Sequence, residues 1–172
     1  MDTDIALLIL RIVFGVSLAA HGAQKLFGWW DGPGLAGFAG WLESMGVRGA
    51  KVAALIAGLV EFVGGIAFAA GLLTPLVALG IVVVMTTAVL NVHLKAGFFN
   101  GSGGWEYNLA IATVAVAVAI TGAGEYSVDD ALGLMGGFTG WEWGLGIAVV
   151  GVLVGVVNNA MRTPPPAAPL GE

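Results

Sequence analysis

The sequence contains no cysteine and few charged residues. The absence of cysteine excludes disulfides, thiolate metal sites, C-x-x-C redox centres and covalent haem attachment. Only 10% of the 172 residues are charged, whereas an ordinary soluble domain carries about a quarter, so polar side chains are too few to cover a surface that faces water. The six basic residues form no cluster, which argues against a nucleic-acid partner.

Apolar residues instead make up 58% of the chain and gather in long windows. A helix needs about 20 predominantly apolar residues to cross a hydrocarbon core. Five windows come near this length, at roughly 5–23, 52–73, 76–92, 107–121 and 144–160. Because backbone groups in lipid must be hydrogen-bonded within the segment, we predict an all-α, polytopic membrane bundle of five transmembrane helices.

Charge divides between the two sets of connections. The basic residues that flank one set are Lys25, Arg48, Lys51, Lys95 and Arg162. The acidic residues of the other set are Asp2, Asp4, Glu125, Asp129, Asp130 and Glu142. By the positive-inside rule we expect a multi-pass membrane protein with its N-terminus outside and its C-terminus in the cytoplasm. The acidic start and Arg11 argue against a cleaved signal peptide, so we expect the N-terminal segment to be retained.

The connections also carry local signals. We predict an interfacial helix near 34–46, because Leu35, Phe38, Leu42 and Met45 share one helical face and tryptophans lie nearby. Thr74 and Pro75 predict the N-cap and first turn of the third long helix. Ser127 is the expected N-cap of a short helix. The Pro-rich tail, 163–172, is expected to be extended or disordered.

Many of the 29 glycines fall at helical spacing inside the apolar windows. Small residues let helices approach closely in lipid. For Gly151 and Gly155 two interpretations stay open, namely tight packing within one bundle and self-association or docking of a partner helix.

Arg11 and Glu61 are the only charges well inside the windows. Each costs roughly 2.5 to 3.5 kcal/mol near a helix centre. Counted from the outer ends of two antiparallel helices, Arg11 lies about 9 Å deep and Glu61 about 15 Å deep. We therefore predict an Arg11–Glu61 ion pair, which either fixes helix register or handles protons.

Other polar residues collect near the cytoplasmic ends of the helices. Ser17, His21, Gln24 and Lys25 share one face of the first predicted helix, near its cytoplasmic end. Asn91 and His93 reach a similar depth on the third predicted helix, and Glu106 and Tyr107 begin the fourth.

Four interpretations of this layer stay open. A quinone head group would find hydrogen-bond donors and a proton relay in His21, Gln24, Asn91, His93, Glu106 and Tyr107. A metal would use His21, His93 and Glu106, although no close-spaced ligand motif supports it. The two histidines would ligate haem b. The last is plain anchoring of helix ends. The Gly-rich loop before Tyr107 lacks the spacing of a nucleotide-binding motif.

Several stretches together resemble the DoxX family of bacterial and archaeal membrane proteins. They are "RIVFGVSLAAHGAQKLFG" (11–28), "LVEFVGGIAFAAGLLTP" (59–75), Glu106 and "AGEYSVDDAL" (123–132). The resemblance covers about residues 5–133 and implies a four-helix membrane domain over 1–133. A further outer loop and transmembrane helix, 134–162, and the tail would be additions to it.

The resemblance also implies a redox role. Members of the family form a membrane subunit of thiosulfate:quinone oxidoreductase, and another is associated with superoxide detoxification and thiol homeostasis, an oxidative-stress function. The expected function is therefore the membrane subunit of an oxidoreductase complex that communicates with quinone, through His21, Lys25, Glu61 and Glu106. Two alternatives stay open, a scaffold that recruits oxidoreductases and a small-solute or proton pathway gated by Glu61.

Overall fold

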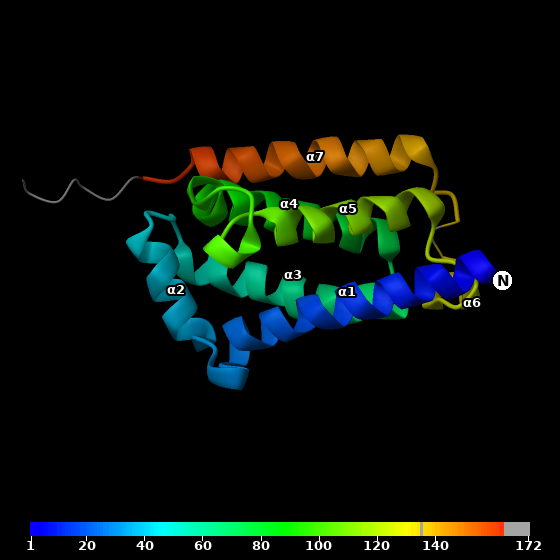
Figure 1. Cartoon of the computed structure of the whole chain (residues 1–172), viewed down its shortest axis with the longest axis horizontal. Helices are drawn as coiled ribbons and strands as arrows, with labels where there is room; N and C mark the ends of the chain where they lie inside the picture. Colours follow the sequence, from blue (N-terminus) through cyan, green and yellow to red (C-terminus); the bar gives the residue numbers. More distant parts are fainter. Residues whose placement is uncertain (135, 164–172) are drawn as a thin grey trace, which may run out of the picture.

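The computed structural model describes residues 1–134 and 136–163, and all regular structure within these ranges is helical. The helices are α1 (Asp2–Phe27), α2 (Gly34–Ser44), α3 (Ala50–Ala70), α4 (Thr74–Ala88), α5 (Glu106–Thr121), α6 (Val128–Ala131) and α7 (Trp141–Ala160). Short π and 3₁₀ turns continue α4 through Val89–His93 and Leu94–Ala96. Figure 1 shows α1, α3, α4, α5 and α7 side by side along one axis, with α2 across one end and α6 at the other. These ends are called the α2 end and the N-terminal end below.

The outer surface of the bundle is apolar. Side chains such as Ile9, Val16 and Leu153 are more than half exposed along the length of the long helices, a pattern that suits lipid and not water. Four helical segments are long and apolar enough to cross a membrane, Asp2–Phe27, Ala50–Ala70, Thr74–Ala96 and Trp141–Ala160. α5 is equally apolar but has only 16 residues. The predicted helical membrane bundle is confirmed.

Glycines set the register between α1 and α3. A Cβ at Gly22 would lie 2.3 Å from the backbone nitrogen of Phe62, and one at Gly65 would lie 2.6 Å from the nitrogen of Ala19. Contacts this short leave no room for any side chain, so the two backbones touch directly. The antiparallel pair is thereby held with Gly22 level with Glu61.

Glycines also seat α7 on α4. A Cβ at Gly151 would lie 2.5 Å from Val82, and one at Gly155 would lie 2.6 Å from Thr86. Both glycines are buried within the bundle. The interpretation of this pair as a self-association or partner-docking face is therefore wrong, because the space that the missing side chains leave is filled by α4 of the same chain.

The core lies between α1, α3, α4, α5 and α7. Its fully enclosed members include Leu18, Phe68, Ile81 and Val118. A second, smaller cluster holds α2 on the first half of α3, with Phe38, Ala39 and Leu42 against Ala50 and Ala54. α2 lies within the segment that the apolar spacing marked as helical, and its position in a membrane interface stays a prediction. The predicted tail, 163–172, lies outside the described residues apart from Thr163.

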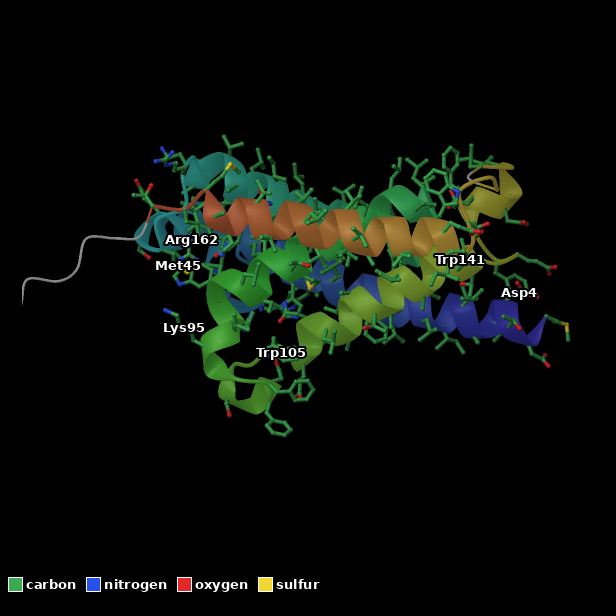
Figure 2. The ribbon with its side chains drawn as sticks, turned by 90° about the horizontal axis from the view of Figure 1, so that it is seen from above. Asp4, Met45, Lys95, Trp105, Trp141 and Arg162 are labelled. Carbon is green, nitrogen blue, oxygen red and sulfur yellow. The ribbon has the colours of Figure 1, made fainter. Side chains whose placement is uncertain are left out.

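Charged and aromatic residues mark the two ends. Figure 2 shows Met45, Lys95 and Arg162 at the α2 end, while Asp4 and Trp141 lie at the N-terminal end. The basic and acidic connections thus lie at opposite ends, because successive connections between long helices alternate from one end of the bundle to the other. Which end faces the cytoplasm stays a prediction from the positive-inside rule.

Candidate functional site: an intramembrane ion pair and its surroundings

Glu61 forms an ion pair with Lys25. The Nζ of Lys25, in the last turn of α1, donates a hydrogen bond to Oε1 of Glu61, midway along α3. The Glu61 side chain is 3% exposed and that of Lys25 is 27% exposed. A buried carboxylate is stable only when it is paired or neutral, and the long lysine stem reaches it because Gly22 brings α1 onto α3 one turn earlier.

One oxygen of this carboxylate remains unused. Oε2 of Glu61 is buried and has no hydrogen-bond partner in the described part of the chain. The Nζ of Lys25 lies 5.2 Å from the centre of the Phe38 ring, which comes from α2. The pair is therefore enclosed by three elements, α1, α3 and α2, and still offers an acceptor and spare N–H donors.

The predicted Arg11–Glu61 pair is wrong. Arg11 lies against Gly71, since a Cβ at Gly71 would lie 1.6 Å from Nη1 of Arg11. Glu61 is ten residues away from Gly71 along α3, which is about 15 Å of helix rise. The prediction counted both depths from the outer ends of the two apolar windows and so took those ends to be level. In the structure α1 extends more than two turns beyond the end of α3, so Lys25 and not Arg11 reaches Glu61.

Arg11 instead holds the connection between α5 and α6. Its side chain is fully buried, and Nη2 donates a hydrogen bond to the backbone oxygen of Tyr126. Nε and Nη1 have no partner among the described residues. The burial of a lone guanidinium is expensive, and it is tolerated here beside the buried carboxylate of Asp129, which attracts it.

Asp129 ties α6 to the start of α4. Its two carboxylate oxygens accept hydrogen bonds from the backbone N–H groups of Leu73 (2.7 Å) and Thr74 (2.9 Å). The prediction of Thr74 as the N-cap is therefore wrong, since Leu73 precedes the helix and a carboxylate 55 residues away satisfies its free N–H groups. The prediction for Ser127 is confirmed, because its hydroxyl accepts from the N–H of Asp130 at 3.1 Å.

The predicted polar layer divides into separate contacts. His21 is exposed on α1, with its ring centre 5.8 Å from that of Tyr107 on α5. His93 donates from Nδ1 to the backbone oxygen of Gly103 at 2.7 Å, because a carbonyl can only accept. Asn91 accepts from Arg162 at 2.9 Å.

The remaining members of the layer are not joined to these contacts. Gln24 and Glu106 are half-buried, and their side chains form no hydrogen bond in residues 1–134 and 136–163. Within those ranges no three His, Asp or Glu side chains are grouped so that they could hold a metal ion. The structure therefore brings together Lys25 with Glu61 and His21 with Tyr107, and leaves His93 in the connector after α4.

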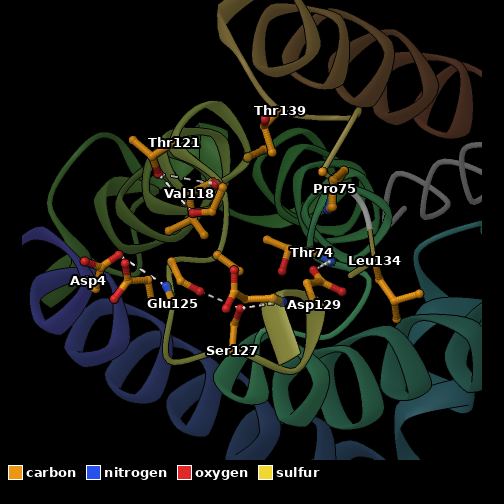
Figure 3. A pocket seen from close by; sticks show the side chains of 16 residues that line it. Asp4, Thr74, Pro75, Val118, Thr121, Glu125, Ser127, Asp129, Leu134 and Thr139 are labelled. Carbon is orange, nitrogen blue, oxygen red and sulfur yellow. Dashed lines mark hydrogen bonds between the residues drawn. The ribbon is translucent and has the colours of Figure 1, made fainter. Parts of the chain in front are cut away.

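A cavity of about 280 Å³ opens at the N-terminal end (Figure 3). Carboxylates of Asp4, Glu125, Asp129 and Asp130 line it, together with hydroxyls of the Thr74 and Thr121 side chains. Asp4 accepts from the backbone N–H of Glu125 at 3.2 Å, which closes the connection over α1. Sequence reasoning missed this cavity, although the acidic residues between 125 and 130 were a signal for it.

These features describe a polytopic helical membrane protein with a buried ion pair between its first two long helices and an arginine-anchored connection at the N-terminal end. The chain belongs to the DoxX family, whose sequence profile matches residues 6–94.

Two curated proteins are similar to it. The "Inner membrane protein YqjF" of Escherichia coli (strain K12) is 33% identical over 132 residues, which is 75% of this chain and 93% of that protein. The "Putative oxidoreductase CatD" of Bacillus subtilis (strain 168) is 25% identical over 126 residues, 73% of this chain and 86% of that protein. No solved structure matches the chain significantly.

Proposed function

We propose that this DoxX protein is the membrane subunit of a redox system that communicates with quinone in a bacterial or archaeal inner membrane. An oxidoreductase partner would supply the electrons, since the chain has no cysteine for a thiol centre. The name of CatD supports an oxidoreductase connection, and that of YqjF supports the inner membrane.

The observation that carries the proposal is the unused oxygen of Glu61. A quinone, when bound, exchanges two electrons and two protons. Such a group needs a proton donor or acceptor that is shielded from water and poised by a neighbouring charge. Oε2 of Glu61 is a buried acceptor without a partner in the described residues, and Lys25 holds the other oxygen of the same carboxylate. The residues therefore fit a quinol head group.

His21 and Tyr107 would provide the approach from lipid. His21 lies one helical turn before Lys25 on α1 and is exposed on the apolar surface. Its imidazole and the Tyr107 phenol are both donors and acceptors. In the proposal these two side chains orient the head group near the α2 end, and Lys25 and Glu61 hold and move the proton.

Purification in a mild detergent tests the proposal. We expect quinone and an oxidoreductase polypeptide to copurify with the wild-type chain, and the thermal unfolding temperature to rise when a quinone analogue is added. Glu61→Gln should lose the quinone-dependent rise, whereas Glu43→Gln, which removes an exposed carboxylate on α2, should keep it.

Each component of the result has its own meaning. Recovery of an oxidoreductase without quinone, with no response to the analogue in any variant, would favour a scaffold that recruits oxidoreductases. Recovery of neither would overturn the redox proposal. Proton uptake by sealed vesicles that carry the wild-type chain, lost in Glu61→Gln, would favour a proton pathway.

A further inference from the structure

α2 lies beside the Lys25–Glu61 pair and packs across the end of the long helices, on the first half of α3. Phe38 is 7% exposed, and its ring lies 5.2 Å from the Nζ of Lys25. The ring face attracts the ammonium group and also excludes water from it. Phe38 thus covers part of the ion pair on the α2 side, where the Lys25 side chain is still 27% exposed.

Left-handed backbone conformations bound α2 on both sides. Before it, Trp30 and Asp31 have φ values of 50° and 60°. After it, Gly46 and Gly49 have φ values of 80° and 62°. The left-handed conformation costs a residue with a side chain about 1 kcal/mol or more, so the surrounding fold must hold Trp30 and Asp31 in it. α2 is therefore joined to α1 and α3 by sharp turns and not by continuous helix.

The contacts that keep α2 in place are apolar. Phe38, Ala39 and Leu42 pack on Ala50 and Ala54 of α3. In residues 34–44 the one side-chain hydrogen bond is local, from Ser44 to the backbone oxygen of Trp41. A short helix held by a small apolar contact is the kind of element that opens at a low free-energy cost.

We infer that α2 is a lid over a binding site for an O–H head group, formed by Oε2 of Glu61 and the Nζ of Lys25. When the lid lifts, the ligand hydroxyl donates to Oε2 and its oxygen accepts from Nζ. Both atoms carry free hydrogen-bonding capacity in the described residues. A quinol hydroxyl and a water molecule share this chemistry, and the inference rests on the proposed function only for the choice of quinol.

The rate at which a reagent in water modifies Glu61 measures how often the lid is open. The full chain in lipid nanodiscs is treated with a water-soluble carbodiimide, and the products are mapped by peptide mass spectrometry. An activated Glu61 either reacts with added amine or is attacked by the Nζ of Lys25, which expels the urea and forms an amide, so both products are counted. Glu43, exposed on α2, is the internal reference.

We expect Glu61 of the wild type to react much more slowly than Glu43. Phe38→Ala should accelerate the modification of Glu61 roughly fivefold or more, because it removes both the ring and its apolar packing. Phe38→Leu keeps the apolar contact and should accelerate it only about two- to threefold. Gly40→Ala is the matched control, since a Cβ there meets nothing within 4 Å, and its rate should equal that of the wild type.

The outcomes are distinct. A wild-type Glu61 that reacts as fast as Glu43, or folded Phe38 variants that react as slowly as the wild type, would overturn the lid. Phe38→Leu provides the answer if Phe38→Ala does not fold, as judged by gel filtration and thermal unfolding. A short-tailed benzoquinol should slow the modification of Glu61 in the Phe38 variants.

The benzoquinol result separates the two proposals. If the lid variants behave as expected and the quinol has no effect, water occupies the site, and the quinone part of the proposed function fails while the lid stands. If quinone copurifies with the chain and the Phe38 variants leave the rate unchanged, the lid fails while the proposed function stands.

Discussion

Gly22 of α1 lies directly against the backbone of Phe62 in α3, and this contact decides which charge meets Glu61. A Cβ at Gly22 would lie 2.3 Å from the Phe62 nitrogen. The closeness fixes the axial register of the two helices, so that the last turn of α1 lies beside Glu61. Lys25 becomes its partner as a result, and Arg11 is left at the far end of α3.

Substitution at this contact should separate α1 from α3. Gly22→Ala forces one backbone away from the other, and we expect a loss of about 1 to 3 kcal/mol in the free energy of unfolding. The measurement is unfolding in mixed micelles, followed by circular dichroism. Gly40→Ala, where a Cβ meets open space, is the control and should lose nothing. Equal stability of the two variants would contradict the direct backbone contact.

Removal of Lys25 should destabilise the bundle more than removal of an exposed lysine. Lys25→Met leaves Glu61 buried without a counter-charge, and we expect a loss of about 3 to 5 kcal/mol in mixed-micelle unfolding. Lys51→Met, at an exposed position, should be nearly silent. The double variant Lys25→Met with Glu61→Leu should recover most of the loss, because no lone charge remains. Absence of that recovery would argue against the pair.

Asp129 should be far more important for stability than its neighbour Asp130. Asp129→Ala removes the acceptor of two N–H groups at the start of α4, and the loss of such a cap costs about 0.5 to 2 kcal/mol, with a further penalty for the buried Arg11. Asp130→Ala changes an exposed carboxylate next to it. Thermal unfolding temperatures of the two variants in the same detergent check the difference, and a similar shift in both would contradict the capping role.

Gly151 should matter for the attachment of α7 and not for oligomeric state. Gly151→Leu clashes with Val82, and we expect a loss of about 1 to 3 kcal/mol together with faster proteolysis at the connection before α7. Gly146→Leu adds the same side chain at an exposed position with open space and serves as the control. Light scattering in detergent should give one mass for both variants. A mass that falls only in Gly151→Leu would restore the self-association hypothesis.

Much of the architecture was predictable from local patterns. The long apolar windows give the helices of α1, α3, α4, α5 and α7, because only helices of this length satisfy their backbone groups in lipid. The Ser127 cap was also predictable, because a hydroxyl that accepts from an N–H group three residues later is a local interaction. The sequence also showed that Arg11 and Glu61 must face the interior, where both lie.

The partners of the buried charges were not predictable in this way. Depth was counted from the ends of each window, but helices in a bundle can slide along one another by several turns without a change in either sequence pattern. The same limit applies to Thr74, whose neighbouring N–H groups are capped by Asp129 from a distant connection. It applies to Gly151 too, since small residues look alike whether they face a helix of the same chain or of another.

Local sequence patterns were enough to establish a helical membrane bundle, the positions of its helices and the charges that are kept from lipid, because these follow from the energy of each segment in hydrocarbon. The pairing of Lys25 with Glu61, the capping of α4 by Asp129 and the contact of Phe38 with Lys25 could be read only from the packed helices. Those contacts depend on how far one helix slides past the next, and that distance is set by the closest approach of backbones at glycines such as Gly22.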